Sequence, residues 1–213
     1  FKDQGKLDAA LTKYRKALEI KPDYHQAHSN LLFTLQYQAE TDPGELYEAH
    51  LKWGETHAKP LAEKMLPLSN DPNPERRLRI GYVSPDFRSH SCAYFLEALL
   101  RAHNRERTEI FCYSELEKTD AMTERIRGLS DHWYDTIKKS HDDVAEQIRK
   151  DRIDILVDLA GHTANNRLLV FAQKPAPIQV TWLGYPDTTG MDVMDYRFTD
   201  AVADPEGVAD PYI

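Results

Sequence analysis

Short runs of β-prone residues alternate with helical patterns from residue 78 onwards, and this alternation restricts the possible folds more than any other feature. Strands are expected at 78–83, 109–113, 153–159 and 178–182, with weaker ones at 132–135 and 196–199. Helices are expected between them, at about 91–102, 120–128, 142–151 and 165–172. Strands that alternate with helices form a parallel sheet with helices on both faces. The sequence therefore predicts an α/β fold for residues 78–213.

The first 66 residues carry helical patterns instead. Ala10, Tyr14, Ala17 and Pro22 have the spacing of the tetratricopeptide repeat, in which small residues let paired helices approach closely. An ordinary helical hairpin is the alternative. A repeat of about 34 residues cannot bury its apolar face alone, so further repeats are expected upstream. We divide the chain into a partial repeat array (1–40), a helical extension and proline-rich linker (41–77) and the α/β part (78–213).

Composition and chain ends narrow the functional classes. The formal net charge is -8, from 35 acidic and 27 basic residues, which argues against general binding of nucleic acids. No stretch approaches the roughly 18 consecutive apolar residues of a membrane helix. Two lone cysteines, Cys92 and Cys112, do not make a disulfide framework, so a reducing, cytoplasmic location is expected. The chain opens inside a helical pattern and closes without a terminating element, so we expect the complete protein to be longer.

Ligands of an open parallel sheet bind at the carboxyl ends of its strands, so the loops that follow the strands are the places to inspect. The loop after the first strand reads S-P-D-F-R-S-H and ends in His90. The loop after the fourth reads A-G-H-T-A-N-N and includes His162, and the loop after the fifth reads L-G-Y-P-D-T-T-G. Ser89 or Ser91 is expected to cap the next helix, beside free amide donors that suit an anion. On position alone, either histidine is more often structural than catalytic.

Several kinds of site have no support in the sequence. No loop carries G-x-G-x-x-G or a Walker motif, so neither a dinucleotide nor a triphosphate site is indicated. No Asp-x-Asp pair occurs, and the histidines and cysteines lack metal-ligand spacing. We therefore expect neither a metal nor a cofactor.

Three segments together resemble the O-linked N-acetylglucosamine transferase and SPINDLY family of protein glycosyltransferases. They are R-I-G-Y-V-S-P-D-F-R-S-H-S (79–91), I-D-I-L-V-D-L-A-G-H-T-A-N-N (153–166) and K-P-A-P-I-Q-V-T-W-L-G-Y-P-D-T-T-G (174–190). The last two look closer to the SPINDLY branch. The resemblance implies that the α/β part is the first Rossmann-like lobe of a two-lobed enzyme. Such enzymes transfer a sugar from a nucleotide-sugar to protein Ser or Thr, with inversion and without a required metal.

The resemblance also implies roles for individual residues. His90 matches the active-site histidine that has been proposed as proton acceptor. Contact with the sugar and the acceptor is implied for Thr163, Leu183, Gly184, Tyr185 and Pro186. Animal members read H-P-x-x-H in the first loop, whereas this chain has Tyr94 in place of the second histidine, whose role is therefore not carried over.

Three functional hypotheses follow. The first is a protein O-glycosyltransferase that uses UDP-N-acetylglucosamine (UDP-GlcNAc) and protein or peptide acceptors. The second changes the donor to GDP-fucose, and the third is a non-catalytic tetratricopeptide adapter. The family's nucleotide-binding residues belong to a second lobe downstream of Ile213. The cleft loops are expected to offer only Arg88 and Arg167 as cations, so donor binding by this chain alone is not expected.

Overall fold

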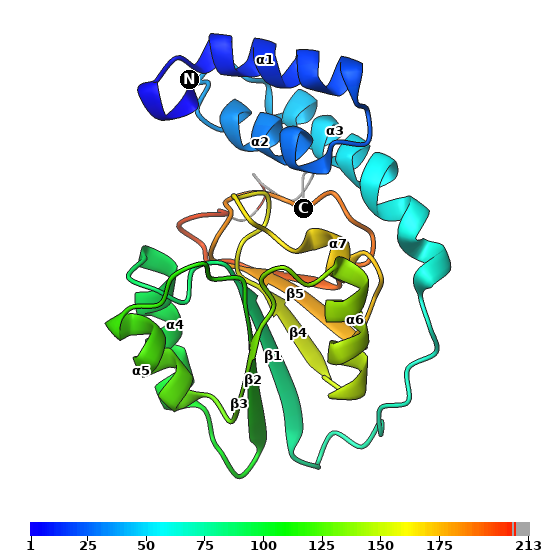
Figure 1. The fold of residues 1–213 in the computed structure, drawn as a ribbon, viewed down its shortest axis with the longest axis vertical. Coiled ribbons are helices and arrows are strands. Elements are labelled where there is room, and N and C mark those ends of the chain that lie inside the picture. Colours follow the sequence, from blue (N-terminus) through cyan, green and yellow to red (C-terminus); the bar gives the residue numbers. More distant parts are fainter. Residues whose placement is uncertain (206, 208–213) are drawn as a thin grey trace.

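The computed structural model describes residues 1–205 and residue 207. They form a helical segment that lies across one end of a parallel sheet (Figure 1). We use the name helical segment for residues 7–64, which reach the sheet through an extended stretch. Its elements are α1 (Leu7–Ile20), α2 (His25–Leu35), α3 (Pro43–Trp53), a π-helical turn (Gly54–Ala58) and a 3-10 helix (Lys59–Lys64), after a first 3-10 turn at Lys2–Gln4.

The described strands form one sheet in the order β3-β2-β1-β4-β5-β6, and every neighbouring pair is parallel. The strands are β1 (Leu78–Ser84), β2 (Thr108–Ser114), β3 (His132–Asp135), β4 (Ile155–Asp158), β5 (Ile178–Trp182) and β6 (Tyr196–Phe198). The predicted parallel α/β sheet is therefore confirmed, together with both weaker strands. Chain order reverses between β1 and β4, and such a switch point is where open parallel sheets bind ligands.

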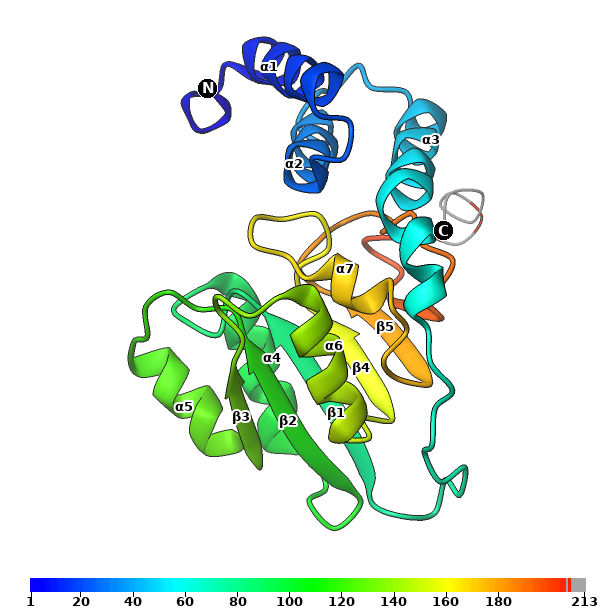
Figure 2. The same ribbon diagram turned by 45° about the vertical axis from the view of Figure 1, so that its right-hand side comes forward.

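Helices cover both faces of the sheet, with α4 and α5 on one face and α6 and α7 on the other (Figures 1 and 2). Side chains that alternate along β1 explain this arrangement. Tyr82 packs with Leu96 and Ile126 from α4 and α5, whereas Val83 packs with Ile148 from α6. These helices are α4 (Ser91–Ala102), α5 (Ala121–Leu129), α6 (His141–Lys150) and α7 (Leu168–Phe171).

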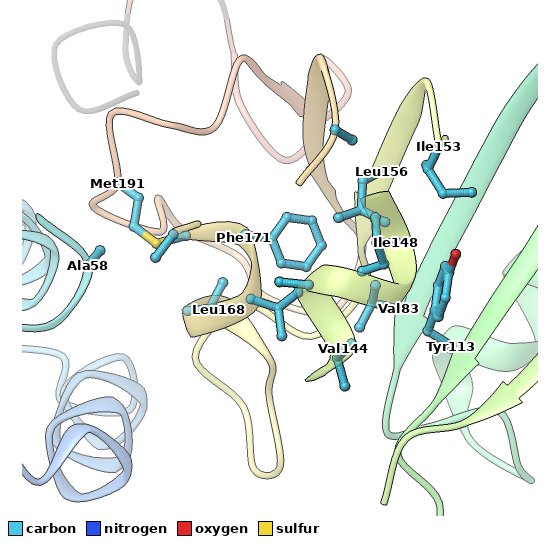
Figure 3. Packing of buried hydrophobic residues seen from close by; sticks show 14 of the residues in the cluster. Ala58, Val83, Tyr113, Val144, Ile148, Ile153, Leu156, Leu168, Phe171 and Met191 are labelled. Carbon is cyan, nitrogen blue, oxygen red and sulfur yellow. The ribbon is translucent and has the colours of Figure 1, made fainter. Parts of the chain in front are cut away.

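The helical segment shares its apolar core with the sheet. Leu32, Trp53 and Ala58 are buried in the same cluster as the side chains of α6 and α7. Figure 3 shows Ala58 beside Met191, which belongs to the loop after β5. No helix in the described part of the chain is long and apolar enough to cross a membrane. The helical segment thus packs directly on the carboxyl ends of the strands, where the predicted site lies.

Candidate active site at the carboxyl edge of the sheet

The loop after β1 ends in His90, which is itself the N-cap of α4. Its backbone is extended (φ -150, ψ 151), and its Nδ1 accepts a hydrogen bond of 3.3 Å from the Cys92 amide. The prediction that Ser89 or Ser91 caps this helix is therefore wrong, because the imidazole nitrogen occupies the place of a serine oxygen. The His90 side chain is 35% exposed, and Asp86 Oδ2 lies 3.9 Å from Nδ1. The ring is thus fixed at the start of the helix and still open to solvent.

Asp158 shapes the loop after β4. This buried carboxylate accepts hydrogen bonds from the amides of Ala160 and Gly161, at 3.1 and 2.8 Å, and from the Thr181 hydroxyl at 2.9 Å. Burial raises the pKa of Asp158, and these three hydrogen bonds oppose that rise. The turn that they stabilise presents Thr163, whose hydroxyl donates to the Ala160 carbonyl at 2.8 Å.

The loop after β5 begins with the turn formed by residues 183–186, which we call the site turn. Its members differ in exposure: Pro186 is exposed, Leu183 and Gly184 are half-buried, and Tyr185 is buried. The Tyr185 ring lies between the loop after β4 and the helical segment, where its hydroxyl is 2.7 Å from His50 Nε2. The four residues of the site turn therefore differ in how far they are open to solvent.

A cavity of about 520 Å³ brings the loops together, and we call it the cleft cavity. His90, Thr163 and Gly184 all line it, so residues from three separate loops meet at the edge where the sequence placed them. Leu183, Tyr185 and Pro186 are not among its lining residues. The cavity also has walls that the sequence did not indicate, contributed by Phe33 of α2 and by the loop after β2 (Glu115, Leu116, Glu117 and Lys118).

The cations of the cleft differ from the prediction. Arg167 is buried, and its guanidinium binds Glu115 at 2.6 Å and the carbonyls of Thr136 and Lys139 at 2.8 and 3.1 Å. It joins the loops after β2, β3 and β4 and is not available to a ligand. Arg88 pairs with Asp86 at 2.8 Å, and Lys118 lines the cavity as well. Expecting only Arg88 and Arg167 was therefore wrong.

His162, the second candidate histidine, is a structural link. It is fully buried, and its Nε2 lies 3.0 Å from the Thr189 carbonyl, which can only accept a hydrogen bond. The ring proton is therefore on Nε2, and Nδ1 accepts from the Ser29 hydroxyl of α2 at 3.1 Å. Burial holds the pKa of His162 well below its ordinary value. This neutral ring joins α2 to the loop after β5.

Among the described residues, no group of three or more histidine, cysteine, aspartate or glutamate side chains is placed to hold a metal ion. Cys92 and Cys112 are buried and unpaired. The chemistry that the cleft cavity itself offers is one half-exposed imidazole, the hydroxyl of Thr163, backbone groups, and charged groups of both signs.

Comparison with known proteins decides the family. Residues 22–213 match the family described as Glycosyl transferase family 41, and residues 1–33 match a TPR repeat. The chain belongs to glycosyl transferase family 41. The predicted resemblance is thereby confirmed, and the match to family 41 includes α2 and α3 of the helical segment.

Similarity to individual proteins agrees with this assignment. A protein of Solanum lycopersicum named "Probable UDP-N-acetylglucosamine--peptide N-acetylglucosaminyltransferase SPINDLY" is 43% identical over 203 residues, which cover 92% of this chain and 21% of that protein. The Caenorhabditis elegans "UDP-N-acetylglucosamine--peptide N-acetylglucosaminyltransferase" is 36% identical over 196 residues, or 90% of this chain and 17% of that protein. The chain thus spans about a fifth of the length of such relatives.

Among solved structures, a mutant of the Thermobaculum terrenum O-GlcNAc transferase superimposes with a TM-score of 0.87. It is 46% identical, and the match covers 92% of this chain and 38% of the other. The likeness extends over the sheet and the helical segment together, since it leaves out so little of this chain.

Proposed function

We propose that the full-length protein containing this chain is a protein O-glycosyltransferase that moves N-acetylglucosamine from UDP-GlcNAc to Ser or Thr hydroxyls of acceptor proteins. Membership of family 41 and the names of the relatives support this proposal. The observation that carries it is the cleft cavity, which His90, Thr163 and Gly184 line from three family motifs. The relatives' names specify UDP-N-acetylglucosamine, and GDP-fucose has no corresponding support.

In the proposed reaction, the acceptor hydroxyl oxygen bonds to the anomeric carbon of the sugar while the bond from that carbon to the phosphate oxygen breaks. The electron pair leaves with UDP, the configuration inverts, and the hydroxyl proton passes to a base. We assign that base to His90 Nε2. A positioned proton acceptor contributes about a hundredfold to ten-thousandfold in rate.

The tautomer of His90 has to suit this role. Its Nδ1 accepts from the Cys92 amide, so in the neutral ring the proton resides on Nε2. Taking a proton at Nε2 requires the other tautomer, with Nδ1–H directed towards Asp86, whose Oδ2 is 3.9 Å away. We therefore propose that substrate binding shortens this distance. Catalytic hydrogen bonds are often long without substrate and become shorter in the complex.

The other residues of the cleft are proposed to hold the sugar and the acceptor. Thr163 and the backbone of Gly184 supply polar groups at the cavity wall. We propose that Leu183, Tyr185 and Pro186, which do not line the cavity, contribute through the site turn that holds Gly184 there. The donor pyrophosphate carries at least two negative charges and requires cations or donors, which we assign mainly to parts of the full-length protein outside this chain. We propose that no metal or cofactor takes part and that the enzyme works in the cytoplasm.

The test is an assay of the purified full-length protein with UDP-GlcNAc and, in parallel, GDP-fucose, using Ser- and Thr-containing peptides. Mass spectrometry identifies the sugar added, and a parallel reaction with EDTA tests the metal. Transfer of N-acetylglucosamine that EDTA does not inhibit is expected. If only fucose were transferred, the donor would be GDP-fucose instead of UDP-GlcNAc. If the protein bound peptides but transferred no sugar, a non-catalytic adapter would be favoured.

A further inference from the structure

The site turn is strained and needs support. Leu183 has a φ of 73°, in the left-handed region of backbone conformation that residues other than glycine rarely adopt. Such conformations persist only where the surrounding structure over-determines them. Gly184, the next residue, lines the cleft cavity, so whatever holds the site turn also fixes one wall of the cavity.

Tyr185 is the anchor of the site turn, and α3 holds it. His50 Nδ1 lies 2.7 Å from the Leu46 carbonyl, which can only accept, so this nitrogen carries the proton. His50 Nε2 is then an acceptor, and the Tyr185 hydroxyl donates to it at 2.7 Å. Burial lowers the pKa of His50 and favours this neutral form.

A second group from the helical segment completes the anchor. Gln36, which follows α2, donates from Nε2 to the Tyr185 hydroxyl at 3.4 Å and to Asp187 Oδ2 at 2.7 Å. The donor and acceptor capacities of the tyrosine hydroxyl are therefore both used. A β-carbon added to Gly161 would come within 2.2 Å of Tyr185 Cβ, so the tyrosine also rests directly on the loop that presents Thr163.

We propose that His50 and Gln36 are positioning residues for the transferase site, which hold Tyr185 so that the site turn and the Thr163 loop keep their places around the acceptor. This inference rests on the proposed function, and it assigns a role in the reaction to the helical segment. His50 and Gln36 touch no reacting atom. They act through Tyr185, whose hydroxyl connects two helices to the wall of the cavity.

The chain contains a matched control. The Tyr82 hydroxyl also lies 2.7 Å from a histidine nitrogen, Nε2 of His103, and Tyr82 is 3% exposed against 7% for Tyr185. Neither Tyr82 nor His103 lines the cleft cavity. Tyr82→Phe therefore removes a tyrosine–histidine hydrogen bond of the same length, here partly buried, at a place where no role in positioning is proposed.

The first experiment measures hydrogen exchange in this chain, which requires no activity. Tyr185→Phe removes only the hydroxyl, and we expect the amides of residues 183–190 to exchange about fivefold faster, as the loss of one hydrogen bond implies. Tyr82→Phe should leave these amides unchanged. Unchanged exchange in Tyr185→Phe, or equal acceleration in Tyr82→Phe, would overturn the proposal.

The second experiment measures transfer by the full-length protein. Tyr185→Phe and His50→Leu are expected to lower kcat/KM for the acceptor by about tenfold to a hundredfold, because small misplacements near the reacting atoms are costly. His50→Gln retains a hydrogen-bonding group and should restore most of the rate, and Tyr82→Phe should match the wild type. Wild-type kinetics in Tyr185→Phe would overturn the role in the reaction. A wild type that transfers no sugar would refute the proposed function, and the exchange experiment would still decide the positioning.

Discussion

Gly54→Ala is the sharpest test of how closely the helical segment is joined to the cleft loops. Gly54 has ordinary helical angles (φ -57, ψ -48) at the end of α3, so alanine suits its backbone. An added β-carbon would nevertheless lie 1.8 Å from the Gly190 carbonyl oxygen, whereas real β-carbons essentially never come within 3.0 Å of another atom. The two backbones would have to move apart by more than 1 Å. Overpacking of this kind costs about 1–3 kcal/mol or more, against a gain of up to about 1 kcal/mol in helix propensity.

We expect a net loss of about 2 kcal/mol, which lowers the midpoint of thermal unfolding by about 4–8 °C for a chain of this size. Differential scanning calorimetry of this chain measures the change. The control is Gly128→Ala in α5, where nothing lies within 4 Å of the added β-carbon, and there a small increase in the midpoint is expected. If the two variants shift the midpoint in the same direction, Gly54 and Gly190 do not pack as closely as the structure shows.

Three further predictions concern the site and the interface. His90→Ala in the full-length protein should lower turnover about a hundredfold to ten-thousandfold. Loss of the helix cap should cost only about 1 kcal/mol of stability. Unchanged turnover would show that His90 has no catalytic role. This chain alone should neither transfer sugar nor bind UDP-GlcNAc with micromolar affinity, as calorimetry would reveal. Burial lowers the pKa of His28, His57 and His141 from 6.5 to about 4. As the pH is lowered, the unfolded chain therefore binds protons before the folded chain does, which favours unfolding. The thermal unfolding temperature should decrease as the pH is lowered from 6.5 to 4, and a constant temperature would contradict this.

The sequence was most informative where local pattern and fold agree. Both faces of the sheet are covered, so the central strands β1, β4 and β5 are short, mostly apolar runs that stand out from the amphipathic helices around them. The carboxyl ends of parallel strands share one edge, and this geometry alone is enough to bring His90, Thr163 and Gly184 together. Here topology converts positions in the sequence into neighbours in space.

Side-chain contacts between residues far apart in the sequence could not be predicted from any sequence pattern. Nothing in the sequence pairs His50 with Tyr185, or Ser29 with His162, across more than 130 positions. The buried state of Arg167 was equally hidden, because an arginine in a loop is usually exposed. Tyr185 was assigned to the substrate contacts by resemblance to the family, and nothing in the sequence showed that its ring is buried against α3.

The helical segment and the sheet are joined by more than the proline-rich linker between them. A boundary drawn in that linker follows composition, yet Trp53 is fully buried and its ring packs edge-on against His162 at 4.8 Å between centroids. Ser29 and His50 reach the loops after β4 and β5 from the same side. The repeat pattern therefore describes how α1 and α2 pack against each other, whereas Ser29 of α2 and His50 and Trp53 of α3 contact the loops of the site. A movement of the repeat array that displaced α2 or α3 would also displace Tyr185, because Gln36 and His50 are hydrogen-bonded to its hydroxyl. The site turn that forms part of the cleft wall would then move as well.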